Sequence, residues 1–149
     1  MLRGISDHGK LQIVLNAVEK GSNPWGCTDY LNQKKRILET GADVYELMND
    51  YPVHTKAVLV DERLSVVGSY NLDMRSTYLD TELMLVIDSE KLNQQISETE
   101  SDYMEKSKEV LANGQETEGA KYQGKVLGCK KKLYYGMLRI IIRPLRQLL

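Results

Sequence analysis

The chain has 149 residues, 42% hydrophobic and 28% charged, which is the balance of a globular protein with room for one domain. Two cysteines without metal-ligand spacing argue against a disulfide scaffold and for a reducing compartment, and no apolar run is long enough for a signal peptide or a membrane span. Residues 1–118 carry a net charge of −9, which disfavours a nucleic-acid partner, and residues 119–149 carry +8.

Apolar periodicity predicts an α/β fold in which helices flank a mixed β-sheet. Thr28 or Asp29 is expected to cap a helix through Leu38, with Gly41 after its end. A second, long amphipathic helix is predicted from Asp88 or Ser89 to about Leu111. In chain order, the predicted strands are residues 11–16, 44–47, 53–60, 64–69 and 82–87.

The last part of the chain changes in composition. Residues 113–123 are polar and rich in Gly and Glu, and we predict a linker or mobile loop there. It would separate a catalytic half-domain at residues 1–112 from a basic amphipathic segment at residues 124–149.

The basic segment has the pattern of an amphipathic helix that Pro144 would kink or interrupt. Its arginines fall on one helical face, and its apolar residues fall on another. This pattern is typical of an element that lies on an anionic membrane surface, and equally of a terminal helix that closes a protein core. The arginines are Arg139, Arg143 and Arg146, and the apolar residues are Tyr134, Leu138, Ile141, Leu145 and Leu148.

The predicted strand at residues 53–60 carries the pattern H-x-K-x4-D, formed by His54, Lys56 and Asp61. Side chains two apart in a strand point the same way, so His54 and Lys56 would lie side by side. Val58 and Val60 would continue this face toward the core. The next strand runs into Gly68-Ser69-Tyr70-Asn71, the pattern G-S-x-N.

These residue types suit a phosphate ester. An imidazole can attack phosphorus or transfer a proton near neutral pH, and Lys56 could neutralise the non-bridging oxygens. Ser69 and Asn71 could donate hydrogen bonds to the same oxygens, so we expect neither a metal nor another cofactor. Asp61 either orients a basic group or caps the turn after the strand.

Together these residues resemble the HKD signature of the phospholipase D superfamily. The continuation from Asn71 to Ser76 (NLDMRS), and Asp80-Thr81-Glu82-Leu83 after it, resembles the bacterial cardiolipin synthase-like branch, which often has Asn at the position of Asp80. The resemblance covers roughly residues 5–110. It implies supporting roles for Gly68, Asp73, Arg75 and Glu82, although Arg75 and Glu82 could instead form structural ion pairs.

The resemblance implies a phospholipid substrate such as phosphatidylglycerol, and transfer of a phosphatidyl group through a phosphohistidine at His54. Such enzymes bring two HKD motifs to one site, whereas this chain has one, because no Asp and no G-S-x-N follow His8-Gly9-Lys10 at the right spacing. The chain is therefore expected to be a C-terminal half. It is a fragment, a homodimer that pairs two His54 residues, or an inactive protein.

Two other functions remain open: a single-motif phosphodiesterase or nuclease, and an inactive membrane-associating module. The expected partners are the phospholipid, an anionic membrane surface, and a second HKD half or second copy. The expected location is peripheral, on the cytoplasmic side of the membrane.

Overall fold

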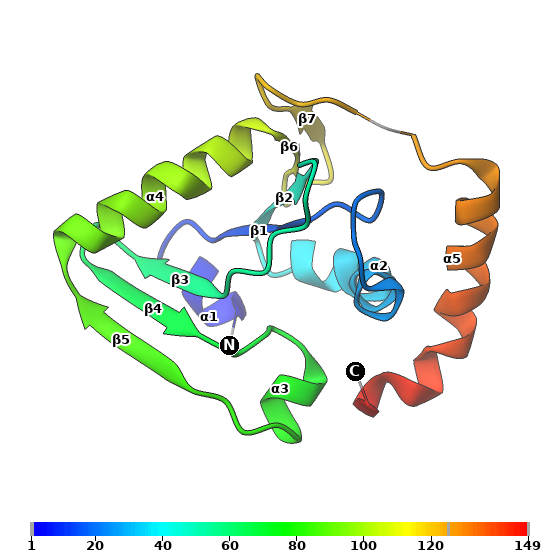
Figure 1. The fold of residues 1–149 in the computed structure, drawn as a ribbon, viewed down its shortest axis with the longest axis horizontal. Helices are drawn as coiled ribbons and strands as arrows, with labels where there is room; N and C mark the ends of the chain where they lie inside the picture. Colours follow the sequence, from blue (N-terminus) through cyan, green and yellow to red (C-terminus); the bar gives the residue numbers. More distant parts are fainter. Residues whose placement is uncertain (1, 125, 149) are drawn as a thin grey trace. The chain divides into compact units, whose positions relative to one another are not determined.

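The computed structural model describes residues 2–124 and 126–148, with side chains up to Leu145 (Figure 1). The chain divides into two compact units. The first comprises the residues up to Val53 together with Tyr103–Arg143, and the second comprises His54–Asp102 with the residues from Pro144. Each unit contains a sheet of its own, and the predicted α/β fold with a mixed sheet and helices is confirmed.

The mixed sheet belongs to the first unit and has the order β1-β2-β6-β7. β1 (Gln12–Asn16) and β2 (Asp43–Leu47) are parallel, with α2 (Pro24–Leu38) between them in the chain. β6 (Ser107–Val110) and β7 (Glu116–Glu118) extend the sheet by antiparallel pairing. A short helix, α1 (Leu2–Ser6), precedes β1. The buried apolar residues lie in this unit, and they include Ala17, Val18, Ala42, Val44, Leu47 and Val110.

Helix α2 begins earlier than the sequence analysis predicted. Its N-cap is Asn23, whose side-chain oxygen accepts hydrogen bonds from the first two free backbone N–H groups of the helix, and Pro24 occupies the first turn. Thr28, one of the two predicted caps, is instead buried inside the helix and donates to the carbonyl of Pro24 at 2.7 Å. The Asn-Pro pair was therefore the stronger start signal.

A buried carboxylate joins three elements of the first unit. Glu46 of β2 is 7% exposed and accepts hydrogen bonds from Tyr30 and Lys34 of α2, both at 2.7 Å. Lys108 of β6 lies 3.1 Å from its other oxygen. Burial raises the pKa of Glu46, but the hydrogen bonds from Lys34 and Tyr30 and the two lysine charges outweigh burial and hold the pKa below its usual value.

Glu46→Gln is expected to destabilise the protein at pH 7 by about 2 kcal/mol, because it removes charge-assisted hydrogen bonds. The pKa of Glu46 is lower in the folded than in the unfolded chain. Its charge therefore stabilises the fold above a pH of about 4.5, the usual pKa, and that contribution is lost as the pH falls through the folded-state pKa. Urea unfolding from neutral to acid pH measures both effects, and the stability of Glu46→Gln should depend less on pH than that of the wild type.

Glu116→Gln is the matched control for Glu46→Gln, since Glu116 contacts Lys108 at the surface, at 3.4 Å. We expect it to change the free energy of unfolding by no more than about 1 kcal/mol. If wild type and Glu46→Gln had equal stability and an equal response to acid, the stabilising role of the Glu46 carboxylate would be contradicted.

The second unit contains an antiparallel sheet of β3 (Ala57–Val60), β4 (Leu64–Gly68) and β5 (Met84–Asp88), in that order. Helix α3 (Met74–Tyr78) lies between β4 and β5 in the chain, and α4 (Glu90–Glu105) follows β5. The buried amide of Asn93 on α4 donates to the carbonyl of Leu64 at 2.8 Å, which ties this helix to the sheet.

The structure places the first HKD residues differently from the prediction. The strand predicted at residues 53–60 begins only at Ala57, so His54 and Lys56 lie in the extended segment before it. The prediction that Val58 and Val60 face the core is wrong, because they are 54% and 43% exposed. The sheet buries its opposite face, where Leu59 pairs with the fully buried Ser65.

A β-hairpin lies where the sequence predicted the end of a helix and a linker. The helix predicted to reach Leu111 ends at Glu105, and β6 follows at once. β7 lies within the predicted linker at residues 113–123. The turn contains Asn113-Gly114, with a positive φ of 83° at Gly114, which is a typical signal for a hairpin.

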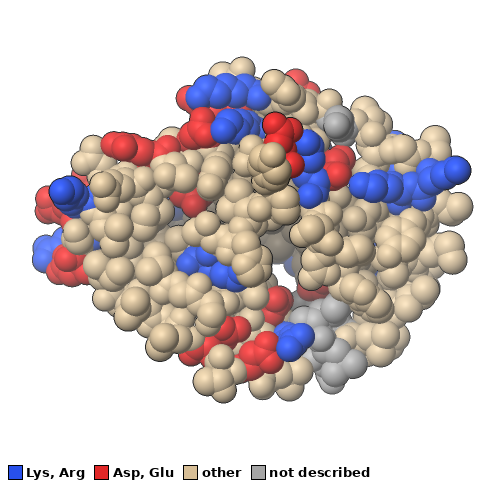
Figure 2. Space-filling model, viewed as in Figure 1, with Lys and Arg blue, Asp and Glu red and all other residues tan. Residues whose placement is uncertain are grey.

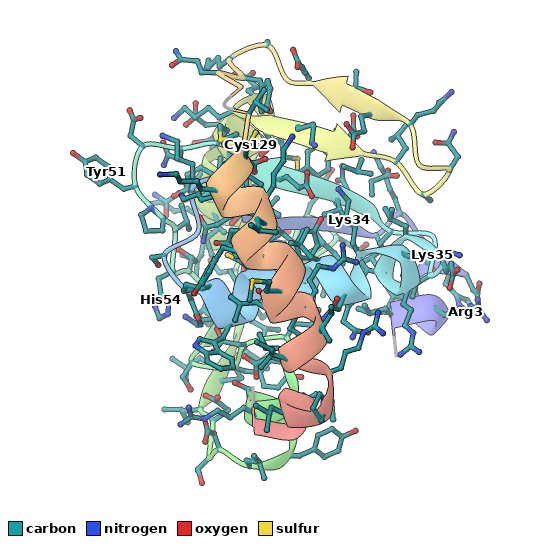
Figure 3. The ribbon with its side chains drawn as sticks, turned by 90° about the vertical axis from the view of Figure 1, so that its right-hand side faces the viewer. Arg3, Lys34, Lys35, Tyr51, His54 and Cys129 are labelled. Atoms are coloured by element: carbon teal, nitrogen blue, oxygen red, sulfur yellow. The ribbon has the colours of Figure 1, made fainter. Side chains whose placement is uncertain are left out.

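The C-terminal segment forms α5 (Cys129–Ile141), which ends before Pro144, and then a 3-10 helix, η1 (Arg143–Leu148). Figure 3 looks onto α5, with α2 behind it, and the two helices are in contact. The side chains of Arg146 and Leu148 are outside the described ones. Of the helices in residues 2–124 and 126–148, none has the length and apolar character needed to cross a bilayer.

Candidate active site

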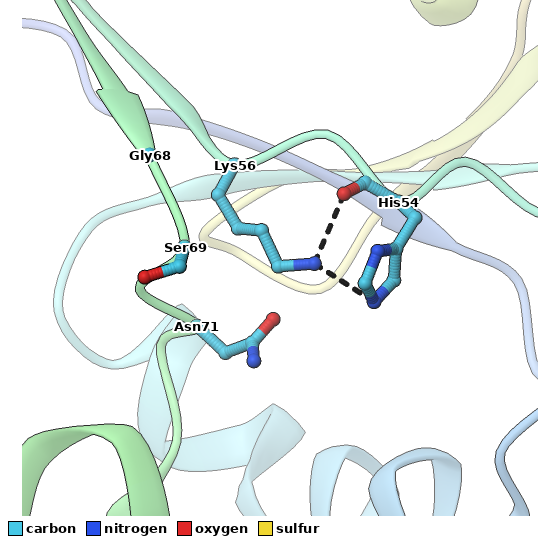
Figure 4. Close-up of a pocket in the computed structure, with 5 residues that line it drawn as sticks. All are labelled: His54, Lys56, Gly68, Ser69 and Asn71. Carbon is cyan, nitrogen blue, oxygen red and sulfur yellow. Dashed lines mark hydrogen bonds between the residues drawn. The ribbon is translucent and has the colours of Figure 1, made fainter. Parts of the chain in front are cut away.

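The two halves of the HKD pattern meet at one surface pocket of about 290 Å³ in the second unit (Figure 4). The extended segment before β3 supplies His54 and Lys56, and the end of β4 and the loop after it supply Gly68, Ser69 and Asn71. The backbone N–H of Gly68 donates to the carbonyl of Lys56 at 3.2 Å, which joins the two segments at the pocket. Five of the nine predicted site residues therefore come together.

The imidazole of His54 and the ammonium of Lys56 are in direct contact. Lys56 Nζ lies 2.8 Å from His54 Nε2 and 3.0 Å from the carbonyl oxygen of His54. Because an ammonium group can only donate, Nε2 is the acceptor in this contact. The lone pair of Nε2 is thus directed at the lysine, next to the side chain of Asn71 in Figure 4.

Gly68 is required by the close approach of β5. A Cβ atom at this position would lie 2.0 Å from the carbonyl oxygen of Leu83 and 2.9 Å from the Cα atom of Met84. Both obstacles are backbone atoms of the neighbouring strand or its start, which cannot rotate away. The glycine of the G-S-x-N pattern therefore sets the distance between β4 and β5 beside the pocket.

Ser69 fixes the same two segments through its hydroxyl group. Its Oγ donates to the carboxylate of Glu82 and accepts from the N–H of Leu83 at 3.0 Å. Hydrogen bonds from Ser69, and then from Ser76, hold the pKa of Glu82 below its usual value. In Figure 4 the hydroxyl of Ser69 points away from His54 and Lys56, so here it supports the pocket wall.

The loop behind Asn71 is held by a capping interaction. Asp73 is the N-cap of α3 and accepts from the backbone N–H of Ser76 at 2.7 Å. The buried hydroxyl of Ser76 in turn accepts from the backbone N–H of Asn71 at 3.3 Å. Ser76 was not predicted as a site residue, although Asp73, three residues before it, is of a type favoured at helix N-caps.

The structure places Asp61 and Arg75 outside the pocket lining. Asp61 begins the turn at the far end of β3 and has a positive φ of 52°, which aspartate tolerates better than most residues. Arg75 Nε lies 2.9 Å from a carboxylate oxygen of Asp80, as a partly exposed structural ion pair.

Comparison with known proteins identifies the family. The family model described as cardiolipin synthase, PLD-like domain, matches residues 2–102. The chain therefore belongs to the phospholipase D superfamily, in its cardiolipin synthase-like branch.

Curated relatives are also similar to part of the chain. Cardiolipin synthase A of Proteus mirabilis (strain HI4320) is 45% identical over 74 residues, which are 50% of this chain and 15% of that protein. Cardiolipin synthase A of Pectobacterium carotovorum is 35% identical over 99 residues, which are 66% of this chain and 19% of that protein. The aligned part of this chain thus spans less than a fifth of either relative.

A solved structure is also similar. The phospholipase D family member Nuc from Salmonella typhimurium aligns with a TM-score of 0.49 at 13% sequence identity, over 79% of this chain and 89% of that chain.

Proposed function

We propose that this chain supplies an HKD half-site for phosphatidyl transfer on a phospholipid such as phosphatidylglycerol. The observation that supports this most directly is the contact of His54 Nε2 with Lys56 Nζ, at 2.8 Å, in a pocket that Asn71 also lines. A nucleophilic nitrogen, a cation and an amide group at one place suit attack on a phosphodiester.

The reaction begins when the phosphodiester enters the pocket. Its non-bridging oxygens take over the ammonium of Lys56 and the amide of Asn71 as partners, so Lys56 releases Nε2. The lone pair of Nε2 then attacks phosphorus. A P–N bond forms, the P–O bond to the glycerol head group breaks, and the negative charge that develops is stabilised by Lys56.

The leaving alkoxide needs a proton, and the resulting phosphohistidine needs an acceptor. In this proposal a second HKD half, supplied by a second copy of the chain, carries the histidine that gives the proton. The same histidine then takes a proton from an incoming hydroxyl group, which attacks phosphorus and restores His54. A second phosphatidylglycerol as acceptor yields cardiolipin and glycerol, and water yields phosphatidic acid and glycerol.

The proposal places the protein at a bilayer, because the substrate is a lipid. We further propose that it works peripherally, on the cytoplasmic side.

Lys56→Met is expected to lower the rate of product formation about 100- to 1000-fold, because it removes the cation that stabilises the developing charge while it keeps a long side chain. The assay incubates purified protein with phosphatidylglycerol vesicles and resolves cardiolipin, phosphatidic acid and glycerol by mass spectrometry.

Lys10→Met is the matched control, because Lys10 also follows a histidine by two residues but lies outside the pocket, 3.9 Å from Asp43. It should retain wild-type turnover. Wild-type protein that forms no product, or the same product rate in both variants, would refute the proposed function.

A further inference from the structure

Helix α5 has two apolar faces, and the first unit covers only one of them. Tyr135 and Ile142 are 5% and 0% exposed, and Tyr135 is hydrogen-bonded to Cys27 of α2. On the other side of the helix, Leu133, Met137 and Ile140 are 70%, 58% and 72% exposed. Packing within the unit therefore explains the first face and leaves the second unexplained.

The exposed residues form one continuous row, which we call the outer stripe (Leu133, Met137 and Ile140). Their spacing of four and three residues places them on one face of a helix with 3.6 residues per turn. Tyr134 and Ile141 flank the row and are 48% and 50% exposed. Three large aliphatic side chains in a row are more than the isolated apolar residues that protein surfaces ordinarily expose.

Basic side chains lie at the start of α5, beside the outer stripe. Lys130 and Lys132 lie in the first turn of α5, whereas Arg139, near its end, donates a hydrogen bond to Asn32 of α2 at 3.0 Å. Residues 119–149 contain eight basic residues and no acidic residue. In Figure 2 the surface over α5, at the right-hand edge of this view, carries blue and tan side chains.

We propose that α5 docks on anionic phospholipid bilayers by inserting the outer stripe at the level of the head groups. The partner must offer an apolar layer beneath a negative surface, and a bilayer with anionic lipid has both. The lysines at the start of the helix then lie among the lipid phosphates, while Tyr135 and Ile142 keep the helix attached to the first unit. This docking is independent of catalysis, so it can be tested without turnover.

The test is sedimentation of the full chain with vesicles of phosphatidylcholine alone, or of phosphatidylcholine and phosphatidylserine in equal parts. Wild-type protein should bind the anionic vesicles and be released as salt rises from about 0.05 M to about 0.5 M. Neutralisation by Lys130→Gln and Lys132→Gln should weaken binding about fivefold per lysine. The double variant Leu133→Ser, Ile140→Ser should weaken it about tenfold or more, because the inserted aliphatic groups are removed.

The matched control is the double variant Leu79→Ser, Val86→Ser, which changes two residues that are 60% and 69% exposed in the second unit. It should bind vesicles as the wild type does. Circular dichroism and thermal unfolding of both double variants check the fold.

Three results would overturn the proposal. The first is that wild-type protein binds neutral and anionic vesicles equally. The second is that the two double variants lose binding to the same extent. The third is that the outer-stripe variant keeps wild-type binding. If the outer-stripe variant instead converts a dimer into a monomer in sedimentation and still binds vesicles, the stripe is a contact between copies.

Discussion

His54→Ala is expected to lower turnover of phosphatidylglycerol by at least about a thousandfold, because it removes the atom that we propose forms the covalent intermediate. In the wild type Nε2 is the ring nitrogen in contact with Lys56, and a ring nitrogen with a free lone pair is the form that can attack phosphorus. Among the residues that line the pocket, the hydroxyl of Ser69 is another possible nucleophile, but it is hydrogen-bonded to Glu82 and is not expected to replace His54.

The measurement has two parts: steady-state turnover, and trapping of the phosphatidyl group on the protein with a neutral denaturing quench, followed by peptide mapping. Wild-type protein should carry an acid-labile phosphatidyl group on the peptide that contains His54. His8→Ala is the matched control, since it removes the other of the two histidines, which lies 3.0 Å from the carbonyl of Gly4. A trapped phosphatidyl group on any other residue would disprove the role of His54, even if turnover fell.

Gly68→Ala is expected to destabilise the protein by about 3 kcal/mol, or to prevent folding of the second unit. The added methyl group would overlap the backbone of Leu83 and Met84, so β4 and β5 would have to separate where they are paired. That movement would also break the contacts of Ser69 with Leu83, and the pocket would lose its wall.

Urea unfolding followed by circular dichroism measures this effect, and Gly136→Ala is the matched control. Gly136 lies inside α5 and has no atom within 4 Å of an added Cβ, so alanine should be neutral or stabilise the protein by up to about 1 kcal/mol. An unfolding midpoint of Gly68→Ala equal to that of the wild type would show that the strands can move apart at little cost.

Local signals in the sequence predicted much of the fold. The strands at β1, β2, β4 and β5 and the bodies of the two long helices α2 and α4 follow from their apolar patterns. The face of β3 could not be predicted in this way. Val58, Leu59 and Val60 are all apolar, so their pattern does not say which side the sheet buries. That choice depends on partners such as Ser65, which are set by the tertiary structure.

The site was predictable to a different extent for each residue. The spacing of His54 and Lys56 placed them side by side, and the structure brings them to 2.8 Å. The engagement of Ser69 by Glu82 could not be predicted, because it joins residues on either side of α3, a helix that the analysis did not foresee. Glu82 and Asp73 thus make supporting contacts, but their partners can be identified only in the folded loop between β4 and β5.

The path of the chain separates the folding of the pocket from that of the mixed sheet. All five pocket residues lie within 18 consecutive positions, and they are joined by the β3–β4 hairpin, a local contact. The sheet of the first unit, in contrast, pairs Val44 with Val110, which are far apart in the chain. Contacts between distant positions form more slowly than local ones. The five pocket residues therefore lie in a segment inserted in the chain between β2 and β6, so we expect changes in this motif to leave the strand order of the mixed sheet unaltered.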